Sequence, residues 1–277
     1  MISADLEQNG WCVLEQRLPR DLLDAVRLRV EARADLDPPD RQDALRSLGS
    51  LVSVLEDPRS LELLEAPALR RALEDAGLGT ARFAGGYVLS KPGHSPATYW
   101  HQDWYFWDDP ASYRHAAPQL GALIYLGETT RDNGALRVIP GSHLRQHPLH
   151  GLLASADVAE LRRGDCAAAL AEQPDEQLVG VRPGDVVLLD ARCLHAAHAN
   201  TRAARRTVVT IWLTPDFDAL SEPVRAFIAH GVVPPPSWDT AARARLAALS
   251  PTYSGGLRRE DVVLCASPDP RRRPRPR

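Results

Sequence analysis

Hydrophobic residues in the first eighty positions recur three or four places apart, which is the spacing of a helix with one apolar face. They are Leu22, Leu23, Val26 and Val30, followed by Leu61, Leu64, Leu69 and Leu73. Pro19 suits the first turn of one helix, and Gly77 and Gly79 suit the end of the second run. The pattern predicts a helical N-terminal part over about residues 1–80.

A different pattern begins near Phe83, where short apolar runs lie between glycine, proline and asparagine residues. Such runs are typical of strands, and Pro140-Gly141 and Pro183-Gly184 are turn dipeptides between them. The runs cover residues 87–89, 120–126, 136–139, 178–181, 186–189 and 208–213. Residues 144–176 are polar and rich in alanine, so we expect a helix inserted between strands there. The predicted β core covers about residues 83–215.

The remaining residues, about 216–269, predict a helical C-terminal part that the run Pro234–Pro236 interrupts. Residues 270–277 form an arginine- and proline-rich tail of the kind that is typically disordered. Helices followed by many short strands predict a mainly β or α+β fold, in which helices flank a sheet sandwich or barrel. We expect residues 1–269 to form a single domain.

The composition is that of an ordinary globular protein, with 277 residues of which 44% are hydrophobic and 25% charged. The formal net charge of -3 is too close to neutral for a protein that binds nucleic acid by neutralising phosphates. No stretch reaches the roughly 18 apolar residues of a membrane span, and the first residues lack the apolar core of a signal peptide. The four cysteines are scattered, which argues against a disulfide framework and a cysteine-ligated zinc site. We expect a cytoplasmic protein that has neither nucleic acid nor a membrane as a partner.

Candidate metal ligands first occur in the tripeptide His101-Gln102-Asp103. Residues two apart on an extended segment point to the same face, so His101 and Asp103 project together and Gln102 turns away. An imidazole nitrogen and a carboxylate oxygen so placed can occupy adjacent positions on one metal ion. The same tripeptide also fits a hydrogen-bonded histidine beside a surface aspartate, and alone it is weak evidence for a metal site.

A second group of polar residues follows about ninety positions later. The turn Arg182–Asp185 leads into an apolar strand, and His195 comes just past the end of that strand. A barrel can bring His195 beside His101 and Asp103, and two histidines with one carboxylate form the facial triad of non-haem iron(II) oxygenases. Arg206 presents a planar fork that binds a carboxylate bidentately. Taken alone, however, Arg206 is better explained as a surface charge at the end of a strand.

The order of these motifs resembles that of the phytanoyl-CoA dioxygenase family, whose members are Fe(II)- and 2-oxoglutarate-dependent oxygenases with a double-stranded β-helix (jelly-roll, cupin-like) core. The resemblance covers about residues 83–215, and the flanks match only in general character. It is carried by His101-Gln102-Asp103, the run Asp132–His143 (DNGALRVIPGSH), the run Pro183–Val187 (PGDVV), His195 with Asn200 five residues later, and Arg206 eleven residues after His195. The run Asp132–His143 between the first motif and a distal histidine is specific to this family.

The resemblance implies that His101, Asp103 and His195 bind iron and that Arg206 binds the distal carboxylate of 2-oxoglutarate. His198 is a rival for His195, but the spacing of the family motif favours His195. The implied cofactor is Fe(II), with 2-oxoglutarate and O2 as co-substrates.

The implied reaction couples oxidative decarboxylation of 2-oxoglutarate, which yields succinate and CO2, to the oxidation of a substrate C–H bond. Related halogenases have a small residue where this chain keeps Asp103, so hydroxylation is favoured over halogenation. Desaturation, epoxidation, cyclisation and epimerisation remain open, as do a zinc hydrolase with the same ligands and a non-catalytic jelly roll that binds a small molecule or a protein partner. We expect a small-molecule substrate, with a biosynthetic tailoring step as the leading interpretation, and leave the oligomeric state open.

Lys91 is the only lysine in the chain, which suggests a site near 2-oxoglutarate or the substrate that needs a compact ammonium group. Chance retention of one lysine is an equal alternative. The aromatic residues Trp104, Tyr105, Phe106 and Trp107 directly follow the first motif. We expect half of this aromatic run to lie in the core and half to line a substrate pocket.

Overall fold

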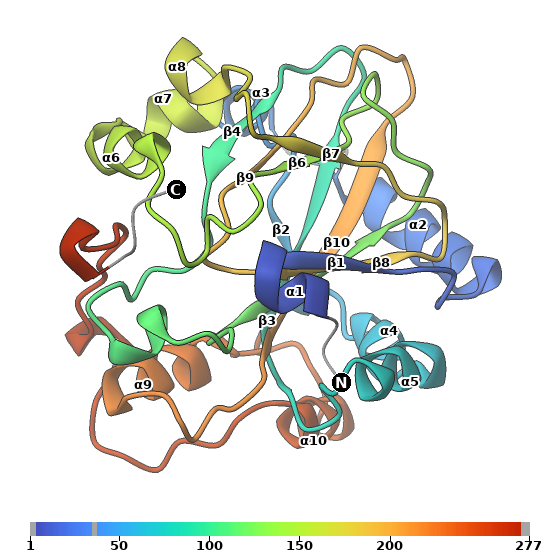
Figure 1. Ribbon diagram of the computed structural model, residues 1–277. Helices are drawn as coiled ribbons and strands as arrows, with labels where there is room; N and C mark the ends of the chain where they lie inside the picture. Colours follow the sequence, from blue (N-terminus) through green and yellow to red (C-terminus); the bar gives the residue numbers. More distant parts are fainter. Residues whose placement is uncertain (1–3, 35–37, 273–277) are drawn as a thin grey trace.

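Two antiparallel β-sheets form the centre of the computed structural model, which describes residues 4–34 and 38–272 (Figure 1). The larger sheet has the strand order β1-β8-β5-β10-β3-β2, and the smaller has β4-β9-β6-β7. The strands of the larger sheet are β1 (Trp11–Leu14), β2 (Val52–Ser53), β3 (Arg82–Lys91), β5 (Leu120–Tyr125), β8 (Val186–Asp190) and β10 (Arg206–Thr214). Those of the smaller sheet are β4 (Thr98–His101), β6 (Leu136–Val138), β7 (Gln177–Val179) and β9 (His195–Ala197). The arrangement is the predicted jelly roll with flanking helices.

Helices pack against the larger sheet, and α6, α7 and α8 lie beside β4 of the smaller sheet (Figure 1). The helices are α1 (Ala4–Asn9), α2 (Arg20–Ala34), α3 (Pro39–Ala44), α4 (Ser60–Leu64), α5 (Pro67–Asp75), α6 (Pro148–Ser155), α7 (Val158–Arg163), α8 (Ala167–Leu170), α9 (Glu222–Gly231) and α10 (Thr240–Leu249). Four 3-10 turns complete the described elements: η1 (Val54–Glu56), η2 (Pro110–Tyr113), η3 (Arg259–Asp261) and η4 (Pro270–Arg272). Apolar residues of α2, α4, α5 and α10 join the larger sheet in one core cluster, and Leu149 of α6 joins the smaller sheet in another.

The strand β5 shows why the central runs are continuously apolar. Leu120 and Ile124 belong to the cluster beneath the helices, whereas Leu123 and Tyr125 belong to the cluster between the two sheets. Alternate residues of a strand point to opposite faces, and here both faces are buried. A strand buried on both sides needs apolar residues at nearly every position, which is the pattern that the sequence shows.

The prediction of an entirely helical N-terminal part was wrong at two places. Helices α2, α4 and α5 lie where the apolar spacing predicts them, but Trp11–Leu14 forms β1 and Val52–Ser53 forms β2. Strand β1 is only four residues long, and its pairing with β8 places Trp11 opposite Leu189. Four residues are too few to give a periodic signal. The strand forms because it pairs with a strand that is distant in the sequence.

Two further predictions differ from the structure in detail. Residues 144–176 contain the three short helices α6, α7 and α8 where we expected one. Residues 270–272 form η4, so the expected disorder of the tail is wrong for them, and residues 273–277 lie outside the described part of the chain.

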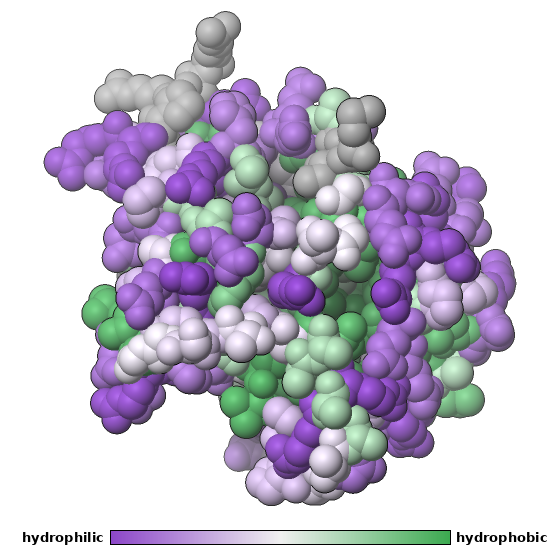
Figure 2. All heavy atoms as spheres, turned by 90° about the horizontal axis from the view of Figure 1, so that it is seen from below, coloured by the Kyte–Doolittle hydropathy of each residue, from purple (hydrophilic) through white to green (hydrophobic). Residues whose placement is uncertain are grey.

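The surface seen in Figure 2 is mostly hydrophilic, and its hydrophobic residues gather in a hollow near the middle and in small groups. In the described part of the chain, no helix has the length and apolar character needed to cross a bilayer.

The N-terminus of α10 offers a test of how the helices are stabilised. The Asp239 carboxylate accepts a hydrogen bond from the backbone N–H of Ala242 at 2.7 Å. We expect Asp239→Ala to lower the free energy of unfolding by about 1 kcal/mol, because the substitution removes the hydrogen bond that caps the N-terminus of α10. Urea denaturation measures the change. Asp218→Ala, at an exposed position, serves as the control and is expected to change stability by less than about 0.5 kcal/mol; equal effects of the two substitutions would contradict the capping role.

Candidate metal centre

Strand pairing brings two histidines that are far apart in the sequence onto one face of the smaller sheet. Strands β4 and β9 are antiparallel, and His101 lies directly opposite His195. Side chains of directly opposed residues lie side by side on the same face of a sheet. The two imidazole rings accordingly lie with their centroids 4.1 Å apart.

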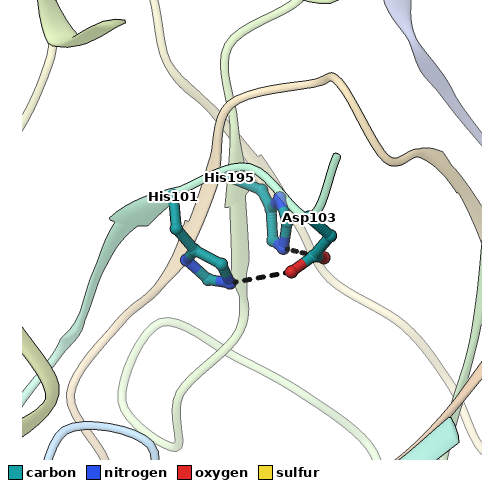
Figure 3. Close-up of side chains that lie close together, drawn as sticks. All are labelled: His101, Asp103 and His195. Atoms are coloured by element: carbon teal, nitrogen blue, oxygen red, sulfur yellow. Dashed lines mark ion pairs between the residues drawn. The ribbon is translucent and has the colours of Figure 1, made fainter. Parts of the chain in front are cut away.

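Asp103 joins the two histidines from the segment just beyond β4. Its backbone N–H donates to the carbonyl oxygen of Ala191 at 2.7 Å, and the N–H of Trp104 donates to the same oxygen at 3.0 Å. The Asp103 carboxylate is held with Oδ2 3.2 Å from Nε2 of His195 and Oδ1 3.9 Å from Nε2 of His101. One ligand atom from each residue lies within 4.8 Å of the others, and Figure 3 shows the three side chains converging.

The backbone fixes the orientation of both imidazole rings. Nδ1 of His101 lies 2.9 Å from the carbonyl oxygen of Tyr99, and Nδ1 of His195 lies 3.0 Å from that of Cys193. A carbonyl oxygen can only accept, so in each neutral ring Nδ1 carries the proton and Nε2 keeps a lone pair that can bind a metal ion. Two imidazole nitrogens and one carboxylate oxygen in this arrangement fit a first-row divalent metal such as Fe(II).

The side chains of His101, Asp103 and His195 shift one another's pKa values. Burial, with a further contribution from His195, lowers the pKa of His101 to about 4. Burial opposes ionisation of Asp103, but the two histidines outweigh it and the pKa of Asp103 lies below its usual value. Burial also opposes protonation of His195, yet Asp103 outweighs it and raises the pKa of His195. Without a metal, Asp103 therefore favours a proton on His195.

Metal binding is expected to release this proton, because a histidine ligates only in its neutral form. The affinity for Fe(II) should fall by up to about tenfold per pH unit as the pH drops below the raised pKa of His195. His101 adds nothing above about pH 5, since its pKa is already about 4. Calorimetry in two buffers of different ionisation enthalpy counts the protons released. Metal binding at pH 6 without proton release would contradict this assignment.

The three candidate ligands line a cavity of about 490 Å³ between the two sheets, and Arg206 lines the same cavity. Arg206 is the first residue of β10 and is only 8% exposed. Its Nε has no hydrogen-bond partner, and no ion pair to it is found within the described residues. A buried charge without a partner is costly unless a ligand supplies the opposite charge, so this guanidinium fits an anion-binding position.

The surroundings of Arg206 leave room for the guanidinium. Its carbon lies 5.6 Å from the centroid of the Tyr125 ring. Gly134, from the run Asp132–His143, has a φ of +89°, and a Cβ there would lie 3.3 Å from both Nε and Nη2 of Arg206. A glycine is suited to this position because it tolerates both the positive φ and the close approach.

Lys91 lies beside Arg206, but it is not among the residues that line the cavity. The two residues are directly opposed in the β3–β10 pair. Lys91 is fully buried, and its Nζ donates to the carbonyl oxygen of Ser47 at 2.5 Å and to Oγ1 of Thr98 at 3.2 Å. Burial and then the charge of Arg206 lower the pKa of Lys91 well below its usual value. Thr98 lines the cavity, so Lys91 supports the wall rather than forming it.

The two other histidines that the motifs include lie elsewhere. His198 follows β9, and it belongs neither to the group of candidate ligands nor to the cavity lining. His143 is buried, and its Nε2 lies 3.1 Å from the carbonyl oxygen of Glu7. The geometry therefore pairs His195, rather than His198, with His101.

The aromatic run after Asp103 divides between core and cavity. Trp104 and Trp107 are almost completely buried and pack in a core cluster with α9. Tyr105 and Phe106 line the cavity. The division into halves was predicted, but the sequence did not indicate which residues belong to which half.

Sequence reasoning missed three other residues of the cavity wall, Tyr99, Arg162 and Arg259. Tyr99 lies two residues before His101 on the same strand, so the alternation that pairs His101 with Asp103 also places Tyr99 on that face. Arg162 and Arg259 lie in helical segments far from the motifs, and nothing in their local sequence distinguishes them from other arginines.

The model of the family "Phytanoyl-CoA dioxygenase (PhyH)" matches residues 6–208. Ectoine dioxygenase of Sphingopyxis alaskensis is 27% identical, with 89% of this chain and 84% of that protein covered. L-proline trans-4-hydroxylase of Streptomyces griseoviridis is also 27% identical, with 79% and 87% covered. The fold resembles that of HygX from Streptomyces hygroscopicus, solved with nickel and 2-oxoglutarate bound, with a TM-score of 0.57, 20% identity, and 76% and 85% of the two chains covered.

Proposed function

The chain belongs to the phytanoyl-CoA dioxygenase family, and from this premise we propose that it is an Fe(II)- and 2-oxoglutarate-dependent dioxygenase that hydroxylates an unactivated C–H bond of a small molecule. One observation carries the proposal. A two-histidine, one-carboxylate group and a buried arginine without a counter-ion line the same cavity. The first suits a divalent metal and the second suits the free carboxylate of a co-substrate that chelates this metal.

His101, Asp103 and His195 would hold the iron, which when bound supplies the activation of O2 coupled to oxidation of 2-oxoglutarate. Three protein ligands leave open positions for the co-substrate and for O2. The backbone contacts of both imidazole rings keep their Nε2 atoms aimed at one point, so little reorganisation is needed on loading.

Arg206 would bind the distal carboxylate of 2-oxoglutarate with its planar fork. The charge of that carboxylate compensates a guanidinium that is otherwise buried and unpaired. The role that we propose for Lys91 is indirect. Its hydrogen bond to Thr98 positions this cavity-lining hydroxyl.

Hydroxylation is the reaction that the ligand set favours, because Asp103 fills the position that a halide would need. A zinc hydrolase with the same three ligands would have no use for Arg206, whose buried charge then stays uncompensated. Desaturation, epoxidation, cyclisation and epimerisation differ from hydroxylation in how the substrate lies, and product analysis separates them.

Anaerobic titration with Fe(II) and then 2-oxoglutarate tests the proposal. We expect one metal per chain, a visible absorption band on addition of 2-oxoglutarate, and release of succinate and CO2 once air is admitted. Zinc-supported hydrolysis without any requirement for 2-oxoglutarate would refute it.

A further inference from the structure

The charges that line the cavity are strongly unbalanced. Arg162 and Arg259 line it in addition to Arg206, whereas the only carboxylate among the lining residues is Asp103. Asp103 belongs to the candidate metal ligands, and Arg206 is assigned to 2-oxoglutarate. Two arginines therefore remain for the part of the cavity left to the substrate, and in the described chain neither forms an ion pair with an acidic side chain.

Arg162 is the one of these two that lies close to the metal centre. Its side chain interacts with the hydroxyl of Tyr99, and both residues line the cavity. The Tyr99 ring in turn lies 5.1 Å, centroid to centroid, from the ring of His101. One tyrosine thus separates the guanidinium from a candidate metal ligand. A group bound by Arg162 would therefore lie near the candidate metal centre.

The backbone of Arg162 is held firmly, although its side chain is exposed. The last turn of α7 ends at Gly164 with a φ of +81°. The carbonyl oxygen of Arg162 accepts a hydrogen bond from the N–H of Ser47 at 3.0 Å, and Oγ of Ser47 donates to the carbonyl oxygen of Leu161 at 3.2 Å. The neighbouring Arg163 instead pairs with Asp165 at 2.7 Å. Two consecutive arginines therefore differ: one is neutralised outside the cavity, and the other faces it unneutralised.

Arg259 lies at another part of the cavity wall, on η3. Its guanidinium carbon is 4.2 Å from the centroid of the Phe227 ring of α9. This stacking on an aromatic face leaves its N–H groups without a carboxylate partner among the described residues. Aromatic side chains also form much of the wall: Tyr87, Tyr99, Tyr105, Phe106, Trp212 and Phe227.

We propose that the substrate carries an oxyanion group, a carboxylate or a phosphate, that binds Arg162 and the hydroxyl of Tyr99, and that its oxidised carbon lies within a few bonds of this group. The remainder of the substrate packs against the aromatic wall. This inference rests on the proposed function, since it concerns the same cavity. A neutral or cationic substrate would leave the positive charge of the cavity uncompensated.

Matched phenyl compounds test the charge requirement in the full chain. Phenylacetate and phenyl phosphate are the anions, phenylacetamide is the neutral counterpart, and phenethylammonium is the cation. Anaerobic calorimetry measures the Kd of each for protein that holds Fe(II) and saturating 2-oxoglutarate, which keeps Arg206 occupied. We expect one of the two anions, phenylacetate or phenyl phosphate, to bind at least about tenfold more tightly than phenylacetamide. We expect phenethylammonium not to bind.

Variants of the two consecutive arginines assign the effect to one residue. Arg162→Ala is expected to weaken binding of the anions by roughly tenfold to a hundredfold and to leave binding of the amide unchanged, because a charge-assisted hydrogen-bonded pair is lost. Arg162→Lys should retain part of the affinity. Arg163→Ala is the matched control and should behave as the unsubstituted protein does. Both side chains are surface-accessible, so the melting temperature of each variant is expected to stay near that of the parent.

Anions that bind no more tightly than phenylacetamide, or an equal loss of affinity in Arg162→Ala and Arg163→Ala, would overturn the inference. Formation of the complex with Fe(II) and 2-oxoglutarate is measured first, so its failure is seen separately as a failure of the proposed function. In that case the titrations are repeated on the metal-free Arg206→Gln protein, which lacks the other carboxylate site. The requirement for Arg162 then still receives a positive or negative answer.

Discussion

Asp103→Ala is expected to lower the affinity for Fe(II) by more than about 100-fold and to abolish 2-oxoglutarate turnover. The reason is geometric: within the described residues, Asp103 is the carboxylate that lies near both Nε2 atoms, at 3.2 Å from that of His195 and 3.9 Å from that of His101. Loss of a hydrogen-bond partner of a metal ligand already costs about 10- to 100-fold in affinity, and loss of a ligand costs more. His195→Ala should have the same effect. Metal content after dialysis and calorimetric titration measure it.

His198→Ala is the matched control for the loss of a histidine three residues away. His198 lies outside the group of candidate ligands. The iron affinity of the variant is therefore expected to stay within a few-fold of that of the parent protein. Loss of iron from the His198 variant, with retention in the His195 variant, would reverse the assignment of the distal ligand.

The second large effect is expected for Arg206→Ala, which should raise the KM and Kd for 2-oxoglutarate by roughly 30- to 1000-fold. This corresponds to a loss of about 2–4 kcal/mol for a desolvated bidentate pair. Iron affinity in the absence of 2-oxoglutarate should not change, since Arg206 is not among the candidate ligands. Anaerobic calorimetry separates the two binding steps.

The same substitution has an informative consequence for stability. Because the guanidinium is buried and has no counter-ion among the described residues, we expect its removal to leave the melting temperature unchanged or to raise it. Arg202→Ala is the control. That residue pairs at the surface with Asp132 at 2.9 Å, and its loss should affect neither stability nor 2-oxoglutarate binding appreciably. An unchanged KM in Arg206→Ala would remove Arg206 from the co-substrate site.

Local geometry explains why part of the candidate site could be predicted. The alternation of side chains along an extended segment places His101 and Asp103 on one face without any knowledge of the fold. The apolar runs of β5, β8 and β10 are likewise strong signals, because each of these strands is buried on both faces. The family resemblance drawn from these motifs is confirmed by the match over residues 6–208.

Non-local pairing explains what the local sequence pattern, without the family resemblance, could not predict. Which histidine lies opposite His101 depends on the register of β4 against β9, and a shift by one residue would turn every side chain to the other face. Strand β1 exists because it pairs with β8, more than 170 residues later, as Trp11 opposite Leu189 shows. Short segments of this kind carry too little pattern of their own to be recognised.

The amino-acid sequence by itself determined the type of fold and the first candidate metal-binding motif. It also supplied the histidine, aspartate and arginine side chains that suit the binding of a metal and a carboxylate. The family motif already favoured His195 over His198, and the tertiary structure places His195 beside His101 and Asp103. Only the tertiary structure decided that Lys91 stands behind the cavity wall, and that Arg162 and not Arg163 faces the cavity. The physical reason is that strand and helix periodicity act over a few residues. The partner that neutralises a charge, by contrast, is set by segments that meet only after the chain has folded.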